Sequence, residues 1–163
     1  MRSKPENKLS SAAIKAWRLT TCIFCLLIGF IPFLFWIYNV VSPGEGNFSI
    51  WMIATLGFLI VVIAGLFITY LPEVRWQHWY YQVDKHEIDL QNGIFIITRT
   101  LVPVKRVQHV DTRQGPILRN YGLADVTIST AATTHRIPAL DEETAEQVRN
   151  QISRFARLAK EDV

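Results

Sequence analysis

Two long runs without a charged residue constrain most strongly how this chain can fold. They extend from Leu19 to Val41 and from Ile50 to Leu71. At a rise of about 1.5 Å per residue, each run forms a helix of roughly 33–35 Å, which is long enough to cross a hydrocarbon core of about 30 Å. We therefore predict two transmembrane helices, at 19–41 and 50–71, which the short segment 42–49 joins into a helical hairpin.

Two other interpretations of the first run are weaker. The run is longer than the apolar region of a cleaved signal peptide, and no small-residue cleavage site follows it. Cys22 and Cys25 form a Cys-x-x-Cys pattern inside it, but a structural zinc site needs four ligands and the nearest histidine, His78, follows both runs. We interpret the two cysteines as small packing residues of a membrane helix, and we predict no metal and no cofactor.

The net charge of +3 belongs to the flank of the first run. Residues 1–72 carry five basic and two acidic side chains, whereas residues 73–163 carry twelve of each. The basic character therefore does not indicate nucleic-acid binding, which would require a basic face on the soluble part. Because basic flanks stay on the cytoplasmic side, we expect both the N-terminus (1–18) and the soluble part (73–163) to lie in the cytoplasm.

We expect Pro72 to end the second span. The chain after it is typical of short antiparallel strands separated by turns. A short helical turn near 116–121 is expected to stop at Gly122, where glycine suits a helix end. Strands are predicted near 79–83, 87–91, 94–102, 107–114, 125–130 and 133–137.

The segment 87–91 alternates apolar and polar residues, which predicts a strand with Glu87, Asp89 and Gln91 on its solvent side. Asn92-Gly93 follows it and is typical of a two-residue type I′ hairpin, because both central positions of that turn need positive φ. The returning strand is then expected to begin directly at Ile94.

From Asp141 onward the apolar period changes from that of a strand to that of a helix. Asp141 is a candidate N-cap, and the glutamates that follow it complement the helix dipole. One apolar stripe recurs at steps of three and four: Ala145, Val148, Ile152, Phe155 and Leu158. The predicted fold is a helical hairpin followed by an α+β domain, in which this helix caps the open end of a small bent sheet or barrel.

The most polar strand begins after Pro103, and a bulge or turn is expected near Arg106-Val107. Its side chains could form a catalytic or metal-binding cluster, or the solvated face of a strand. Since residues two apart lie roughly 6.5–7 Å apart along a strand, we favour the structural interpretation, with a contact to a partner or ligand as the alternative. The candidate contact residues are Lys105, Arg106, His109, Asp111 and Arg113.

Several segments together resemble the YdbS-like bacterial membrane proteins, whose soluble part is a bacterial pleckstrin-homology (PH)-like domain. The specific pieces are the RVQHVD…QGPI block (106–117), YGLA (121–124) and the IPAL-acidic helix start (137–143). The resemblance implies a PH-like fold of two bent antiparallel sheets with a C-terminal helix, and a location in the bacterial cytoplasmic (inner) membrane. It also implies a partner, since members often occur beside a larger membrane protein that carries several such domains.

Three functions are compared on this basis. The favoured one is a membrane-tethered binding or scaffold module, which acts at a sheet edge or a loop rim on a membrane protein partner or a second copy of the chain. The alternative is lipid-headgroup recognition, although Lys85 and His86 in the relevant turn are flanked by Asp84, Glu87 and Asp89. An enzyme is disfavoured, because no nucleophile elbow, P-loop, dinucleotide glycine pattern or metal-ligand spacing is present, and we identify no small-molecule substrate.

Overall fold

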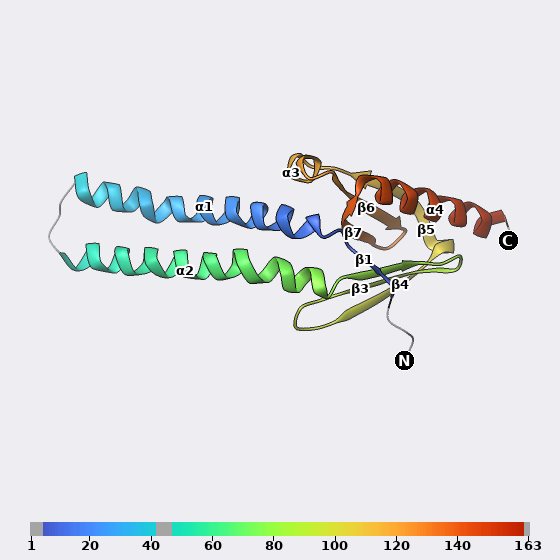
Figure 1. The fold of residues 1–163 in the computed structure, drawn as a ribbon, viewed down its shortest axis with the longest axis horizontal. Coiled ribbons are helices and arrows are strands. Elements are labelled where there is room, and N and C mark those ends of the chain that lie inside the picture. Colours follow the sequence, from blue (N-terminus) through green and yellow to red (C-terminus); the bar gives the residue numbers. More distant parts are fainter. Residues whose placement is uncertain (1–4, 42–46, 162–163) are drawn as a thin grey trace. The chain divides into compact units, whose positions relative to one another are not determined.

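The computed structural model describes residues 5–41 and 47–161, which form two compact units (Figure 1). One unit extends from Trp17 to Glu73, and the other combines the N-terminal residues up to Ala16 with the chain from Val74 onward. The elements, in chain order, are β1 (Asn7–Lys8), α1 (Ala12–Val41), α2 (Asn47–Gln77), β2 (Tyr80–Val83), β3 (Glu87–Asn92), β4 (Thr98–Pro103), the 3₁₀ turn η1 (Val104–Arg106), β5 (Val107–Arg113), α3 (Pro116–Asn120), β6 (Leu123–Thr130), β7 (Thr134–Asp141) and α4 (Glu142–Glu161).

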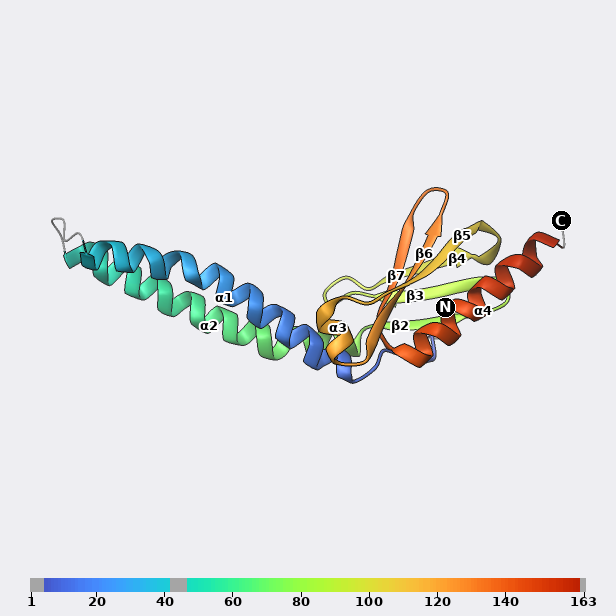
Figure 2. The same ribbon diagram turned by 90° about the horizontal axis from the view of Figure 1, so that it is seen from above.

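The helical unit contains most of α1 and α2, which lie side by side and antiparallel (Figures 1 and 2). Arg18 of α1 donates to the Thr69 carbonyl of α2 at 3.3 Å and lies 3.4 Å from the Glu73 carboxylate. Large apolar side chains remain exposed on both helices; Phe24 and Phe58, for example, are 61% and 73% exposed. A helix that exposes apolar side chains in this way is suited to lipid rather than to water.

One stretch in the described part of the chain, Thr55–Gln77 of α2, is long and apolar enough to cross a membrane. Of the two predicted spans of the hairpin, the structure therefore supports the second. The helix does not end at Pro72, where the second span is expected to end, because α2 continues for five further residues to Gln77. A proline removes one backbone donor but need not end a helix whose other turns are packed, and the Pro72 side chain is buried.

The other unit contains two antiparallel sheets, ordered β1-β2-β3-β4 and β5-β6-β7. The core contains fully buried side chains from both sheets, among them Ile88, Leu123, Ile128 and Ile137, together with Ile152 of α4. α4 contacts η1 and all three strands of the second sheet, and it crosses that sheet in Figure 1. The predicted order of short antiparallel strands followed by one helix is confirmed.

The apolar stripe of α4 differs from the prediction at its C-terminal end. Ala145, Val148 and Ile152 are buried as expected, but Leu158 is 48% exposed, and Ala156 is buried at 8% exposure. The stripe therefore follows the steps 145, 148, 152 and 156, which keep one face on a helix of 3.6 residues per turn. Leu158 lies two residues beyond Ala156, and such positions do not face the same way on a helix.

The turn between β3 and β4 also differs from the prediction. β4 begins at Thr98 rather than at Ile94, so the connection is the five-residue loop 93–97 and not a two-residue type I′ turn. Gly93 has φ 129°, and a Cβ there would lie 1.9 Å from the Ile96 carbonyl oxygen. The loop therefore requires glycine at position 93 because its backbone folds back on itself.

Asp89 is another departure, because the predicted solvent side of β3 is buried at this position. Asp89 is 6% exposed, and Arg99 of β4 donates to it from Nε at 3.0 Å to each carboxylate oxygen and also from Nη2. This hydrogen bond raises the pKa of Arg99 above its ordinary value. The alternation of apolar and polar residues could not reveal that Arg99, ten residues away, pairs with Asp89.

The N-terminal segment completes the first sheet, which the sequence did not predict. β1 pairs with β2, with Asn7 opposite Tyr81 and Lys8 opposite Tyr80. Leu9 is buried at 3% exposure, and its carbonyl accepts a hydrogen bond from Trp76 Nε1 at 3.0 Å. Residues near both ends of the chain therefore belong to one folded unit.

A bulge between β6 and β7 is centred on the buried Asp125. Ala124 pairs with Leu140 and Val126 with Ile137, so Asp125 lies opposite both Pro138 and Ala139. Pro138 has no N–H, and the Ala139 N–H donates to the Asp125 carboxylate at 2.8 Å, while Arg136 forms an ion pair with the same group. Ala139 has φ 50°, which this bulge imposes on a non-glycine residue.

Tyr81 links pH to the stability of this unit. The side chain is 4% exposed, and burial, reinforced by the charge of Asp141, raises its pKa above the ordinary value. The neutral, buried Tyr81 side chain contributes fully to the stability of the domain below a pH of about 10, near which tyrosine ionises in the unfolded chain. As the pH rises further this contribution is lost, because the unfolded chain ionises more readily than the folded domain. We expect Tyr81→Phe to lessen the alkaline decline in urea-unfolding midpoints, and Tyr121→Phe to retain it. If the urea-unfolding midpoint of Tyr81→Phe declines at alkaline pH as much as that of the wild-type chain, Tyr81 does not link pH to stability.

Candidate functional site

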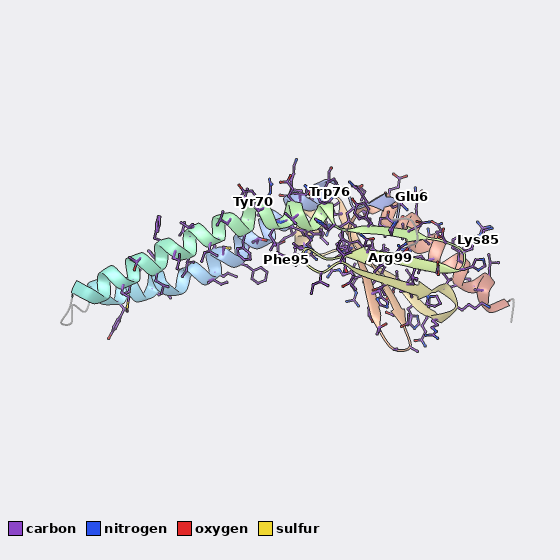
Figure 3. The ribbon with its side chains drawn as sticks, turned by 90° about the horizontal axis from the view of Figure 1, so that it is seen from below. Glu6, Tyr70, Trp76, Lys85, Phe95 and Arg99 are labelled. Atoms are coloured by element: carbon purple, nitrogen blue, oxygen red, sulfur yellow. The ribbon has the colours of Figure 1, made fainter. Side chains whose placement is uncertain are left out.

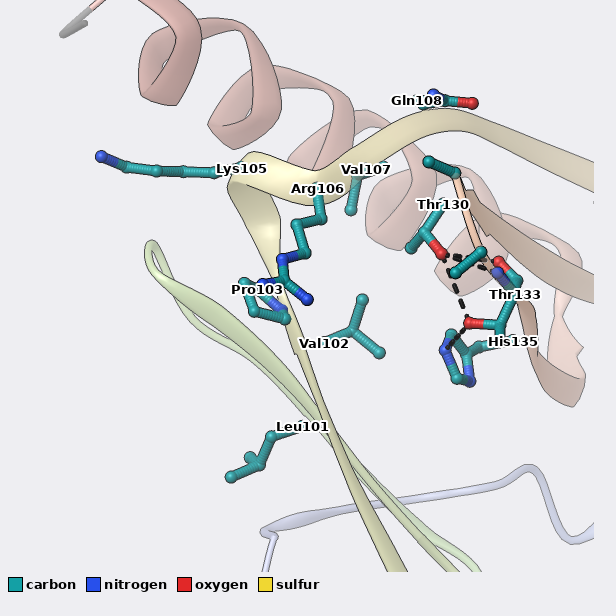
Figure 4. Close-up of a pocket in the computed structure, with 12 residues that line it drawn as sticks. Leu101, Val102, Pro103, Lys105, Arg106, Val107, Gln108, Thr130, Thr133 and His135 are labelled. Carbon is teal, nitrogen blue, oxygen red and sulfur yellow. Dashed lines mark hydrogen bonds between the residues drawn. The ribbon is translucent and has the colours of Figure 1, made fainter.

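A pocket of about 600 Å³ lies at the end of the domain where β4 turns into β5 (Figure 4). We call it the η1 pocket. It is formed by the end of β4, η1, the start of β5 and the β6–β7 turn. The residues that line it are Leu101, Val102, Pro103, Lys105, Arg106, Val107, Gln108, Thr130, Ala131, Ala132, Thr133 and His135.

Local sequence accounts for the η1 side of the pocket. Pro103 is the last residue of the β4 ladder, and the following Val104 is fully buried and donates its N–H to the His86 carbonyl at 3.0 Å. Since Val104 points into the core, Lys105 and Arg106 remain exposed beside it. The register shift between Val107 and His109 confirms the predicted bulge at the start of β5.

Hydroxyl groups fix the opposite side of the pocket. Thr130 Oγ1 donates to the Thr133 carbonyl at 2.8 Å and accepts from the Thr133 N–H at 3.0 Å. Thr133 Oγ1 lies 2.9 Å from Nε2 of His135. These bonds hold the β6–β7 turn in one conformation and leave the exposed Ala131 and Ala132 at its tip.

The charged side chains that line the η1 pocket are cationic. Lys105 and Arg106 contribute positive charge, and none of the lining residues carries a carboxylate. Figure 4 shows Arg106 directed toward Val102 and Pro103, whereas Lys105 points away from them. A guanidinium beside apolar side chains can hold a carboxylate through two parallel hydrogen bonds, so the pocket is suited to an acidic ligand.

The structure separates the five predicted contact residues into two groups. Lys105 and Arg106 line the η1 pocket, whereas His109, Asp111 and Arg113 lie on the exposed face of β5 and do not line it. Sequence reasoning missed the β6–β7 turn, which β5–β6 pairing brings near η1 because Val107 lies opposite Thr130. The sequence predicts strands near 125–130 and 133–137, but only this long-range register shows that the turn between them belongs to the site.

The described residues contain no group of three or more histidine, cysteine or acidic side chains that could hold a metal ion. A second hollow of about 570 Å³ lies between β5 and α4, where three arginines of α4, Arg149, Arg154 and Arg157, line it together with Val110. Only one apolar strand residue, Val110, lines this hollow, whereas the η1 pocket combines cations with the buried Val102 and Val107. We therefore take the η1 pocket as the candidate site.

Comparisons with known proteins agree with this architecture. Residues 18–156 match the family model described as bacterial PH domain. The chain is 46% identical over 168 residues to the UPF0699 transmembrane protein YdbS of Bacillus subtilis (strain 168), and the match covers the whole length of both chains. No solved structure matches.

Proposed function

Because the chain belongs to the bacterial PH domain family, we propose that it is a membrane-anchored, non-catalytic binding module that holds an acidic protein segment in its η1 pocket. The observation that carries the proposal is the cationic lining of this pocket, which contains no carboxylate. The family match, the relative named as a transmembrane protein and the apolar α2 support the membrane association in this proposal.

The proposal includes two membrane crossings, by α1 as well as α2. β1 and β2 are paired, and Ser10 donates to the Asp141 carboxylate at 2.8 Å, so the residues before α1 and after α2 belong to one unit. A unit that contains both ends must lie on one side of the membrane, which requires an even number of crossings between them. If α2 crosses, α1 must cross back. The basic N-terminus then favours the cytoplasmic side.

In this proposal the partner meets the end of the domain that lies away from the junction with α2. β2 runs from Tyr80, near the end of α2, to Val83, and Tyr80 lies opposite Gln91 of β3. The turn at Lys85 and the adjoining η1 therefore lie at the other end of the first sheet, at least about 13 Å along the strands from the α2 junction. A partner anchored in the same membrane would reach the pocket with a cytoplasmic segment, and tethering would raise its effective concentration.

Lipid-headgroup recognition is the less favoured alternative. It relies on Lys85 and His86, but the register places their turn at the end of the sheet away from α2. Asp84 and Glu87 flank these two residues in sequence, so the turn offers little net positive charge to a phosphate.

Site-specific photo-crosslinking of the full chain in native membranes tests the proposed function. A photoreactive residue at Ala132, on the exposed tip of the β6–β7 turn, should capture a partner segment rich in Asp and Glu. We expect Arg106→Glu to weaken binding of the partner segment about tenfold, or roughly 1.4 kcal/mol, because the reversed charge repels the carboxylates. The weaker binding should appear as a lower crosslink yield. Asp111→Lys, on the exposed face of β5, is the matched control and should leave the yield unchanged.

Equal yields from the wild-type chain and Arg106→Glu would contradict a role of the η1 pocket. Crosslinks to lipid in place of protein would favour the headgroup alternative.

A further inference from the structure

The β3–β4 loop carries an exposed apolar tip in an otherwise well-covered domain. Phe95, Ile96 and Ile97 are 95%, 81% and 59% exposed, and residues 93–97 carry no charge. Beyond the helical unit, the other large apolar side chains of comparable exposure among the described residues are single ones, Leu101 and Leu158. Three consecutive exposed apolar residues are unfavourable in water and indicate a surface that has a partner.

The register locates this tip at the end of the sheet from which the chain joins α2. Gln91 lies opposite Tyr80, and β3 ends one residue later, so the loop begins beside the segment that connects β2 to α2. Figure 3 shows Phe95 and Trp76 toward this end of the domain and Lys85 at the opposite end. The loop tip belongs to the same compact unit as the end of α2 from Val74 to Gln77.

Other side chains at this end have the composition of a membrane interface. Lys8 Nζ lies 5.1 Å from the Trp76 ring centroid and 5.4 Å from that of Tyr80. Tryptophan, tyrosine and lysine are the residues that gather where a span meets the headgroups, and the apolar stretch of α2 ends at Gln77 in the same place. The exposed tip therefore lies at the same end of the first sheet as the junction with α2.

We propose that the loop 93–97 inserts Phe95, Ile96 and Ile97 into the interface of the bilayer that α2 crosses. The inserted loop docks the PH-like domain at this end, and the η1 pocket then opens on the far side, toward the cytoplasm. This inference rests on the membrane crossing of the proposed function. An apolar tip with no basic side chains recognises hydrocarbon rather than a particular headgroup, so the insertion depends little on lipid charge.

The test uses the full chain in vesicles of phosphatidylcholine and phosphatidylglycerol, in a Cys22→Ser, Cys25→Ser background. An environment-sensitive fluorophore is attached at Ile96→Cys in the loop, at Lys85→Cys at the opposite end of the sheet, and at Leu59→Cys within α2. Lipids that carry a nitroxide quencher are then added. We expect the labels at positions 59 and 96 to lose most of their emission, and the label at 85 to keep it. Adding Phe95→Ser and Ile97→Ser should restore emission at position 96.

Three results would overturn the inference. If position 96 is as bright as position 85 while position 59 is quenched, the loop does not insert, although the anchor stands. If position 59 also stays bright, α2 does not cross and the proposed function fails as well. If the emission of the label at position 96 changes with the protein-to-lipid ratio but not with the quencher, a second copy of the chain covers the tip.

Discussion

Replacing Asp125 with alanine is expected to lower the free energy of unfolding of the PH-like domain by about 3 kcal/mol. Asp125 is 2% exposed, and its carboxylate accepts from the Ala139 N–H and pairs with Arg136. Without it, the buried Ala139 N–H loses its acceptor at a bulge where the neighbouring Pro138 cannot donate a ladder hydrogen bond. Asp125→Asn should lose less, because its amide oxygen can still accept from Ala139.

The measurement is urea-dependent pulse proteolysis of the full chain in lipid nanodiscs. The matched control is Asp111→Ala on the neighbouring strand, which is exposed and should change the free energy of unfolding by less than about 0.5 kcal/mol. Equal losses in the two variants would show that Asp125 does not hold the bulge.

Leu9→Ala is expected to lower the free energy of unfolding of the same domain by about 3 kcal/mol, as truncations of buried leucines generally do. Leu9 is 3% exposed and lies between β1 and α1, so its loss should also loosen the pairing of Asn7 and Lys8 with β2. Hydrogen exchange of the full chain in nanodiscs should then show faster exchange of β2 amides.

Leu158→Ala is the matched control for this effect. Leu158 belongs to the apolar stripe predicted from the sequence but is 48% exposed, so its truncation should cost less than about 0.5 kcal/mol. If Leu9→Ala is as mild as Leu158→Ala, the N-terminal segment is not an integral part of the domain.

Local patterns predicted the elements of this fold well, because each depends on neighbouring residues. The uncharged runs indicate helices, the alternation in 87–91 and 125–130 indicates strands, and Gly122, with φ 63°, ends α3. The resemblance to PH-like proteins rested on the 106–117, 121–124 and 137–143 segments. Two of these carry the bulge at the start of β5 and the residues opposite Asp125, which are features of the fold rather than of a ligand.

The predictions that were wrong or incomplete depend on contacts between distant residues. Burial of Asp89 requires Arg99 from the next strand, and the place of β1 requires β2, more than seventy residues away. The η1 pocket likewise forms only when β5–β6 pairing brings Thr130 opposite Val107. No periodicity within one segment contains this information, so sequence reasoning found Lys105 and Arg106 but not the turn that faces them.

The two ends of the first sheet have complementary character. One end carries the apolar loop 93–97 and the junction with α2, and the other carries Lys85 and adjoins η1. Under the proposed function, a domain held at its apolar end would present the cationic pocket away from the membrane, where a partner segment could reach it.

The most direct test of a domain built from both ends of the chain is the sidedness of Glu6 and Lys85, which Figure 3 shows on that unit. Glu6→Cys and Lys85→Cys are made singly in a Cys22→Ser, Cys25→Ser background and treated with a membrane-impermeant maleimide in intact spheroplasts and after lysis. We predict that neither cysteine reacts in intact spheroplasts and that both react after lysis. Reaction of one position but not the other before lysis would place the two residues on opposite sides of the membrane and contradict the single domain.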